Sequence, residues 1–121
     1  MLLSDKKVRQ VTIEEKNDLL NKYFAKKERL AKAFIGKRKA RRKYALAKRA
    51  KKEKLEYMRL CAEYDEENMH IAIHDHAKAL EVYNREEKKY LNSCDRCDVF
   101  LCELRDLRED IKKANMVLGL L

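Results

Sequence analysis

The 121 residues have the length of a single domain, and their formal net charge is +9. Charged residues make up 42% and hydrophobic residues 45% of the chain, which excludes both a disordered tail and a membrane-spanning protein. Pro is absent and Gly occurs only twice, so a β-sandwich or a loop-rich enzyme fold, which needs these residues for its turns, is disfavoured. We therefore expect an all-α protein built from long helices with narrow apolar stripes.

Helix start signals occur at Ser4 and, more strongly, at Thr12, where Glu15 can reach back to complete a capping box. From this point an apolar pattern with a seven-residue period continues far along the chain, which is typical of coiled-coil packing. One set of its positions holds Ile13, Leu20, Phe34, Leu55, Ala62 and Met69, and the other holds Tyr23, Leu30, Tyr44, Met58 and Ala72.

The apolar pattern is expected to fail in one stretch. There, the basic residues Lys37, Arg41, Lys48 and Lys51 take the positions of the seam. A seam position that carries a charge is poorly suited to a core. Our interpretation is that this stretch faces a partner.

Candidate helix breaks are Gly36, residues 65–68 and Asn92–Ser93, and residues 65–68 are either a turn or a polar stretch of helix. Asn92–Ser93 is the strongest signal, because either residue could cap a final helix that starts near Cys94. The prediction is two or three long helices that form a coiled-coil-like hairpin or bundle.

All helices are expected to belong to one domain, residues 1–121. Residues 1–54 would form the basic region, residues 55–92 a middle helix and residues 93–121 a C-terminal assembly helix.

The C-terminal region continues the apolar register through Phe100, Leu104, Leu107, Ile111, Ala114, Leu118 and Leu121. A stripe this apolar must be buried against something. Because the core of a monomer would be thin, a homo-oligomer is expected, held together by Val99, Phe100, Leu104, Leu107, Ile111 and Leu118. The alternative is a hairpin in which this helix packs on residues 55–82 of the same chain.

The positive charge is concentrated in one part of the chain. Residues 22–54 hold 16 basic and two acidic groups, whereas residues 1–21 are balanced and residues 55–121 sum to −5. Within this zone, residues 37–54 hold 11 Lys and Arg against Glu53 alone. Like charges three and four residues apart repel along a helix. This segment therefore predicts binding of a polyanion, with a solvated helix face as the alternative.

The composition of the basic segment narrows the choice of polyanion. A membrane-surface helix needs an apolar face, and residues 37–54 offer only Tyr44 and Leu46, so no membrane partner is expected. Lys, Arg and Ala hold phosphates without reading bases, which favours sequence-neutral binding to nucleic acid. Single strands would also use stacking aromatics, for which Phe34, Tyr44 and Tyr57 are nearby candidates. The predicted contacts are Lys37, Arg38, Lys39, Arg41, Arg42, Lys43, Lys48, Arg49, Lys51, Lys52, Lys54 and Tyr57.

Residues 52–58, with the sequence Lys-Glu-Lys-Leu-Glu-Tyr-Met, resemble the basic-x-basic-Leu-acidic-aromatic motif of the UvsY-type recombination mediators of tailed phages. Residues 69–82 follow this motif at a distance comparable to that found in the family. Residues 98–114 are similar to the family's C-terminal helix. The resemblance implies a small helical homo-oligomer that binds single-stranded DNA. Such a protein helps a RecA-like recombinase to displace single-strand-binding protein. Lys52 and Lys54 would then contact DNA, with Leu55 and Tyr57 packed beneath them.

Four cysteines and three histidines raise the question of a metal site. Cys94 and Cys97 have the spacing of a metal or redox pair, and His70 and His74 share one helical face close to His76. Because Cys94 and Cys97 are expected to open a helix, whereas structural zinc ligands usually lie in tight turns, we expect no metal and no cofactor.

Catalysis is not expected, because the chain has neither a Gly-rich phosphate loop nor a nucleophile elbow. The first residues carry no apolar run, so a reducing compartment is expected. This would be the cytoplasm, that of a bacterial host if the chain is phage-encoded. The alternative function is that of a helical adaptor or inhibitor that binds an acidic protein surface or a nucleic-acid channel. A third hypothesis is a metal-dependent regulator that uses Cys94, Cys97 and the histidines.

Overall fold

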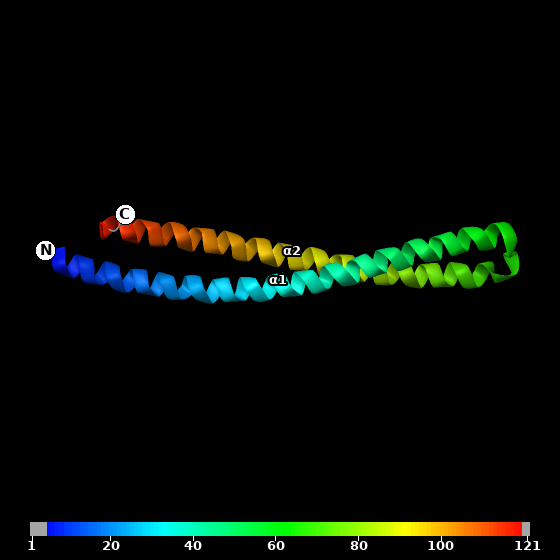
Figure 1. Ribbon diagram of the computed structural model, residues 1–121, viewed down its shortest axis with the longest axis horizontal. Helices are drawn as coiled ribbons and strands as arrows, with labels where there is room; N and C mark the ends of the chain where they lie inside the picture. Colours follow the sequence, from blue (N-terminus) through cyan, green and yellow to red (C-terminus); the bar gives the residue numbers. More distant parts are fainter. Residues whose placement is uncertain (1–4, 120–121) are drawn as a thin grey trace. The chain divides into compact units, whose positions relative to one another are not determined.

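The computed structural model describes the backbone of residues 5–119 and the side chains of residues 12–119. It contains helix α1 (Asp5–Tyr64), the short 3-10 helix η1 (Glu66–Asn68) and helix α2 (Met69–Val117), in this order along the chain (Figure 1). The described residues include no β-strand. The prediction of an all-α chain with a helical hairpin is confirmed.

The turn between the two helices lies at residues 65–68, where the sequence left open a turn or a polar stretch of helix. Asp65 has φ −153° and ψ 69°, which are not helical values, and its amide donates to the carbonyl of Cys61 at 2.9 Å. The side-chain amide of Asn68 donates to the Asp65 carboxylate at 2.6 Å. Short polar side chains of this kind compete with the helical backbone for hydrogen bonds, and this is why the helix ends here.

The other candidate breaks, at Gly36 and at Asn92–Ser93, do not occur. Both positions lie inside continuous helices. One Gly costs a helix only about 1 kcal/mol, which the surrounding helical residues offset. Ser93 does not cap a new helix, because its hydroxyl donates to the Tyr90 carbonyl at 2.6 Å within α2. The expected third helix is therefore part of α2.

The predicted start of the first helix at Thr12 is also wrong. α1 is already helical from Asp5, so Thr12 lies within the helix, where it is a buried residue. The signal at Ser4 and the seam position at Leu121 lie outside the described residues.

The chain divides into two compact units, each of which pairs a segment of α1 with a segment of α2 (Figure 1). Unit 1 comprises residues 5–34 and 96–119 of the described chain. Its core consists of Leu30, Cys97 and Leu104, and Tyr23, Ala33 and Phe100 pack against this core. Lys26 forms an ion pair with Glu103, and its ammonium group lies 5.8 Å from the centroid of the Phe100 ring.

Unit 2 comprises residues 35–95 and includes the turn at η1. Its buried residues are small, apart from one acidic side chain: Ala47, Cys61, Ala72 and Glu86. Small side chains at a helix–helix contact bury little apolar area. The stability of unit 2 therefore depends on its other contacts between the two helices.

The covered positions of α2 follow an unbroken heptad seam with steps of three and four residues, as a left-handed coiled coil requires. They include Met69, Ala72, His76, Ala79, Tyr83, Glu86, Tyr90, Ser93, Cys97, Phe100, Leu104, Leu107, Ile111 and Ala114, and Leu118 continues the spacing just after the helix.

On α1 one of the two predicted sets of seam positions is correct, and the other is displaced by one residue in most heptads. Tyr23, Leu30, Tyr44 and Met58 are covered as expected, and so are Leu20 and Leu55, whereas Ile13, Phe34 and Ala62 are exposed. The last predicted positions, Met69 and Ala72, are covered on α2. The positions one residue earlier, including Ala33, Ala40, Ala47 and Cys61, are covered.

This displacement corrects the interpretation of the basic segment. Ala40 and Ala47 take the seam positions that had been assigned to Arg41 and Lys48, and both basic residues are exposed. The other two predicted seam positions, Lys37 and Lys51, are half-buried as expected. The seam therefore continues through the segment with Ala at one set of positions, because burying Ala costs far less than burying an unpaired charge.

Candidate nucleic-acid interface

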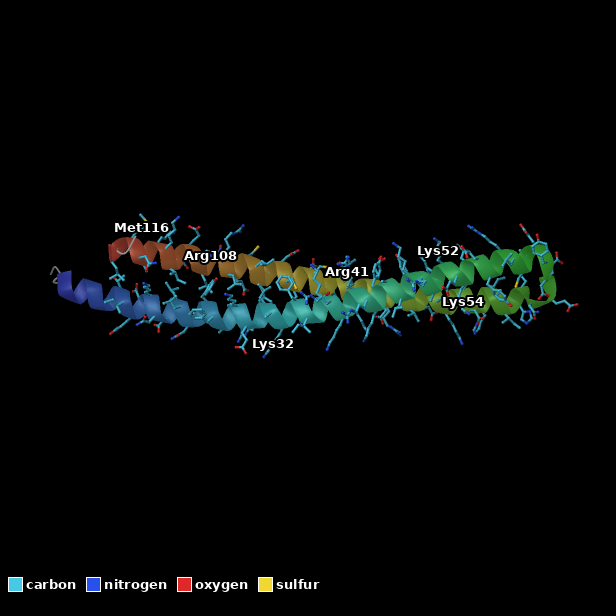
Figure 2. All side chains as sticks on the ribbon, in the orientation of Figure 1. Lys32, Arg41, Lys52, Lys54, Arg108 and Met116 are labelled. Atoms are coloured by element: carbon cyan, nitrogen blue, oxygen red, sulfur yellow. The ribbon has the colours of Figure 1, made fainter. Side chains whose placement is uncertain are left out.

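The basic segment, residues 37–54, lies entirely in unit 2 and on one uninterrupted stretch of α1. Figure 2 labels three of its residues, Arg41, Lys52 and Lys54, among side chains that extend away from the ribbon. Lys37 and Lys51 are half-buried. The other nine basic side chains are exposed, namely Arg38, Lys39, Arg41, Arg42, Lys43, Lys48, Arg49, Lys52 and Lys54.

Few of these cations are neutralised. The ammonium group of Lys54 lies 3.9 Å from an oxygen of Asp75. Within the described part of the chain, none of the other ten basic residues of the segment forms an ion pair with a carboxylate. Pairs such as Arg38 and Arg42 stand four residues apart, where like charges repel. The segment thus presents a concentrated positive surface to solvent.

Tyr44 is not available for base stacking, contrary to its prediction as a stacking aromatic. Its ring stacks on that of Tyr90, with centroids 5.5 Å apart and planes at 14°, and lies 5.5 Å from the ring of Tyr83. Its hydroxyl donates to Glu87 Oε2 at 3.3 Å and lies 3.2 Å from the Tyr83 hydroxyl. Tyr44 therefore joins the basic segment to α2.

Tyr83 also contacts the basic segment through Lys51, whose ammonium group lies 3.7 Å from the centroid of the Tyr83 ring. The hydrogen bond with Tyr44, followed by the one with Glu87, raises the pKa of the Tyr83 phenol well above its usual range. A phenol held neutral in this way can keep donating a hydrogen bond at high pH.

Tyr57 is the one predicted contact residue that is aromatic, and this residue is 43% exposed. Its hydrogen bond with the Cys61 side chain raises the pKa of Tyr57, and Asp65 and Asp75 add to this effect. Phe34, the third aromatic candidate, belongs to unit 1. Within unit 2, Tyr57 is the predicted aromatic that a base could reach.

Glu86 is a functional candidate that the sequence reasoning missed, since the run at residues 81–89 resembles a solvated helix face. The residue is 8% exposed, and one carboxylate oxygen lies 3.6 Å from Arg85 Nε and 3.8 Å from Lys89 Nζ. The other oxygen is buried without a hydrogen-bond partner. The heptad spacing between Tyr83 and Tyr90 was the signal that could have placed Glu86 in the seam.

The residues predicted to carry assembly lie in unit 1. Leu104 is buried and Val99 is 55% exposed, whereas Phe100, Leu107, Ile111 and Leu118 are half-buried. The core formed by Leu104 with Leu30 shows that this helix packs on the N-terminal part of α1, not on residues 55–82. Their role in assembly stays a prediction, and packing within the chain already covers much of the stripe.

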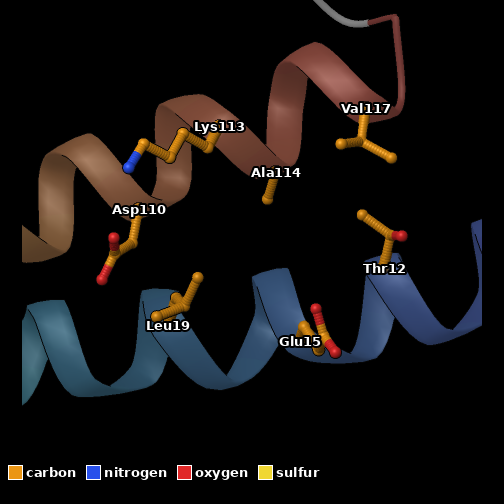
Figure 3. Close-up of a pocket in the computed structure, with 7 residues that line it drawn as sticks. All are labelled: Thr12, Glu15, Leu19, Asp110, Lys113, Ala114 and Val117. Atoms are coloured by element: carbon orange, nitrogen blue, oxygen red, sulfur yellow. The ribbon is translucent and has the colours of Figure 1, made fainter.

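A hollow in unit 1 differs from the basic segment in its charge. Figure 3 shows Thr12 and Val117 pointing toward one another from the two helices at this hollow, which has a volume of about 280 Å³. Two carboxylates and one ammonium group line it, so it has no excess of positive charge. Its lining consists of Thr12, Glu15, Leu19, Asp110, Lys113, Ala114 and Val117.

The cysteines and histidines are dispersed. Cys61 and Cys97 are buried, Cys94 and His76 are half-buried, and Cys102, His70 and His74 are exposed. Among the side chains of residues 12–119, no three His, Cys, Asp or Glu groups come together in a way that could hold a metal ion.

Comparison of the chain with protein-family models, with curated proteins and with solved structures gave no match. Neither helix, over the residues described, contains a stretch long and apolar enough to cross a membrane.

Proposed function

We propose that this chain is a sequence-neutral nucleic-acid-binding protein that holds the phosphates of single-stranded DNA with residues 37–54. One observation carries the proposal. Nine basic side chains of this segment are exposed on a continuous helix, and only one of the nine, Lys54, pairs with a carboxylate in the described structure.

The charge density of the segment supports this choice. Eighteen helical residues span about 27 Å, so 11 cations give roughly one positive charge per 2.5 Å of helix axis. One strand of DNA carries one negative charge per about 3.4 Å of helix axis, so the cations are dense enough to neutralise a single strand. The cations surround the helix, however, so one strand would contact only part of them at a time. A single flexible strand can follow such a surface more closely than a stiff duplex can.

The residue types support binding without sequence preference. The segment contains no Asn or Gln, the side chains that read adenine, and its charged groups suit phosphate contacts. Tyr57 is positioned beyond the last basic residue of the segment, where its exposed ring could stack on one base.

The biological role that we propose is that of a recombination mediator. It rests on the resemblance of residues 52–58 to the motif of the UvsY-type mediators. In this role the protein would act as a homo-oligomer and load a RecA-like recombinase onto DNA held by single-strand-binding protein.

The test is a titration of fluorescently labelled single-stranded and double-stranded oligonucleotides at two salt concentrations. If about five phosphates are contacted, log K should fall with log salt at a slope of roughly −3.5 for the single strand. Binding that does not weaken with salt, or no binding at low salt, would contradict the proposal.

A matched pair of variants locates the site. Lys48→Ala with Lys52→Ala removes two exposed cations of the basic segment, and Lys112→Ala with Lys113→Ala removes two exposed cations of unit 1. The first pair should weaken binding about tenfold or more, since two phosphate contacts are lost, and the second should change it little. Equal losses would show that only the net charge matters.

A further inference from the structure

Unit 2 contains a groove with an apolar floor inside the basic surface. The groove has a volume of about 350 Å³ and is lined by residues of both helices, namely Lys43, Leu46, Ala47, Ala50, Val82 and Glu86. Leu46 is 63% exposed and Val82 is 39% exposed. Phosphates gain nothing from such aliphatic groups, so nucleic-acid binding leaves this floor unexplained.

Both helices contribute positive charge beside this floor. Lys43 of α1 lines the groove itself. On α2, Arg85 and Lys89 lie within 3.8 Å of Glu86, another lining residue, and their side chains are 63% and 59% exposed. Since Glu86 is buried, the groups that a partner would meet here are ammonium and guanidinium groups around aliphatic side chains.

We infer that this groove is a docking site for an acidic amphipathic helix of a partner protein. Apolar side chains of that helix, spaced three and four residues apart, would contact Leu46, Ala50 and Val82, as in other helix-in-groove complexes. Asp and Glu residues beside them would face Lys43, Arg85 and Lys89. The third helix would extend the two-helix packing of unit 2 into a three-helix bundle.

The charges oppose occupation of the groove by a second copy of the same chain. Two copies that met through this groove would bring two sets of Lys43, Arg85 and Lys89 together, and like charges at an interface repel. An acidic helix gains attraction from the same groups. The inference does not rest on the proposed nucleic-acid binding, although both use Lys43.

The experiment uses the full chain and a synthetic, fluorescently labelled amphipathic peptide of about 18 residues, long enough to span about 27 Å as a helix. The peptide carries Leu at helical spacing and Glu on both flanks of the Leu stripe. A second peptide with Lys in place of each Glu is the control. Fluorescence anisotropy should detect binding of the acidic peptide, weakening as salt is added, and no binding of the basic one.

The variants Leu46→Gln and Val82→Gln each remove an apolar contact without changing the charge. Each should weaken binding of the acidic peptide about tenfold. Leu91→Gln, at an exposed apolar residue that does not line the groove, is the matched control and should leave binding unchanged. Circular dichroism checks that each variant remains helical, and light scattering gives its mass.

Several results would overturn the inference. The first is equal affinity for the acidic and basic peptides, or affinity for neither. The second is an equal loss of binding with Leu91→Gln. If Leu46→Gln weakened a labelled oligonucleotide as much as the peptide, the groove would belong to the nucleic-acid surface. If the wild-type chain were a dimer that Leu46→Gln dissociated, a second copy would be its occupant.

Discussion

The ring of Tyr44, in the basic segment of α1, stacks on the ring of Tyr90 of α2 at a centroid distance of 5.5 Å. The same residue bonds to Glu87 and contacts Tyr83, so one side chain of the basic segment makes several contacts with α2. These contacts hold a strongly charged helical stretch against its neighbour while its cations remain exposed. In unit 2 the tyrosines fill the seam between the helices, as larger aliphatic residues do in most coiled coils.

Replacing Tyr44 should therefore destabilise unit 2. Tyr44→Ala removes the aromatic stacking and is expected to lower the free energy of unfolding by about 2 kcal/mol, since the ring is only half-buried. Tyr44→Phe keeps the ring, loses the contacts with Glu87 and Tyr83, and should cost roughly 1 kcal/mol. Urea titration followed by circular dichroism measures both values. Equal losses in the two variants would show that the hydroxyl, and not the stacking, carries the stabilisation.

The two lysines of residues 52–58 should differ in their contribution to nucleic-acid binding. Lys54 already lies 3.9 Å from Asp75, whereas Lys52 has no ion-pair partner among the described residues. Lys52→Ala should weaken oligonucleotide binding and lower the salt slope by roughly 0.7, which is the contribution of one phosphate contact in a single strand. Lys54→Ala should have a smaller effect on both quantities.

Salt titrations of the two variants, carried out side by side, test this difference. Their helicity serves as the control, because both residues are exposed and neither loss should alter folding. If Lys54→Ala has the larger effect, the ion pair with Asp75 does not prevent Lys54 from contacting phosphates. If neither variant changes binding, the phosphate contacts lie elsewhere in the segment, nearer residues 37–43.

Replacing Glu86 with Leu should stabilise the protein. The carboxylate occupies a seam position, and one of its oxygens is buried without a hydrogen-bond partner. Leu removes this desolvation cost and adds apolar contact, so the free energy of unfolding should rise by about 1–2 kcal/mol. Glu87→Leu is the matched control. It removes the acceptor of the Tyr44 hydroxyl, so it should not stabilise the protein. Thermal unfolding of both variants measures these changes. A loss of stability in Glu86→Leu would contradict the prediction.

The stability of the protein should fall as the pH rises above about 10, where the Tyr83 side chain ionises in the unfolded chain but stays neutral in the folded one. The folded-state pKa of Tyr83 is raised above the ordinary value of 10.0, because the hydrogen bonds with Tyr44 and Glu87 favour the neutral phenol. This contribution is fully present below about pH 10 and is lost as the pH rises through the folded-state pKa. Tyr83→Phe lacks the group and should lose less stability over the same range. The test is to measure the urea midpoints of the wild-type protein and of Tyr83→Phe between about pH 8 and pH 11. If the two midpoints fall in parallel with pH, Tyr83 does not contribute as predicted.

Much of the helical architecture could be predicted from the sequence. The absence of Pro, the polar residues at 65–68 and the apolar period of Tyr23, Leu30, Tyr44 and Met58 all acted locally, and the structure agrees with them. The signals at Gly36 and Ser93 failed for a physical reason. The cost of one Gly is small beside that of breaking a long helix, and a Ser hydroxyl can bond to the backbone within a helix as readily as at its end.

The location of the positive charge and its density were properties of the sequence alone, since they depend only on which residues follow one another. Which faces of the helix point to solvent was decided by the tertiary structure. A shift of one residue in the seam moved Arg41 and Lys48 to the surface and Ala40 and Ala47 inward. The contacts of Tyr44 with Tyr83, Glu87 and Tyr90 on the other helix, and the burial of Glu86, likewise depend on packing. Residues so distant in sequence come into contact only through packing, and this packing determines whether a carboxylate is buried or solvated.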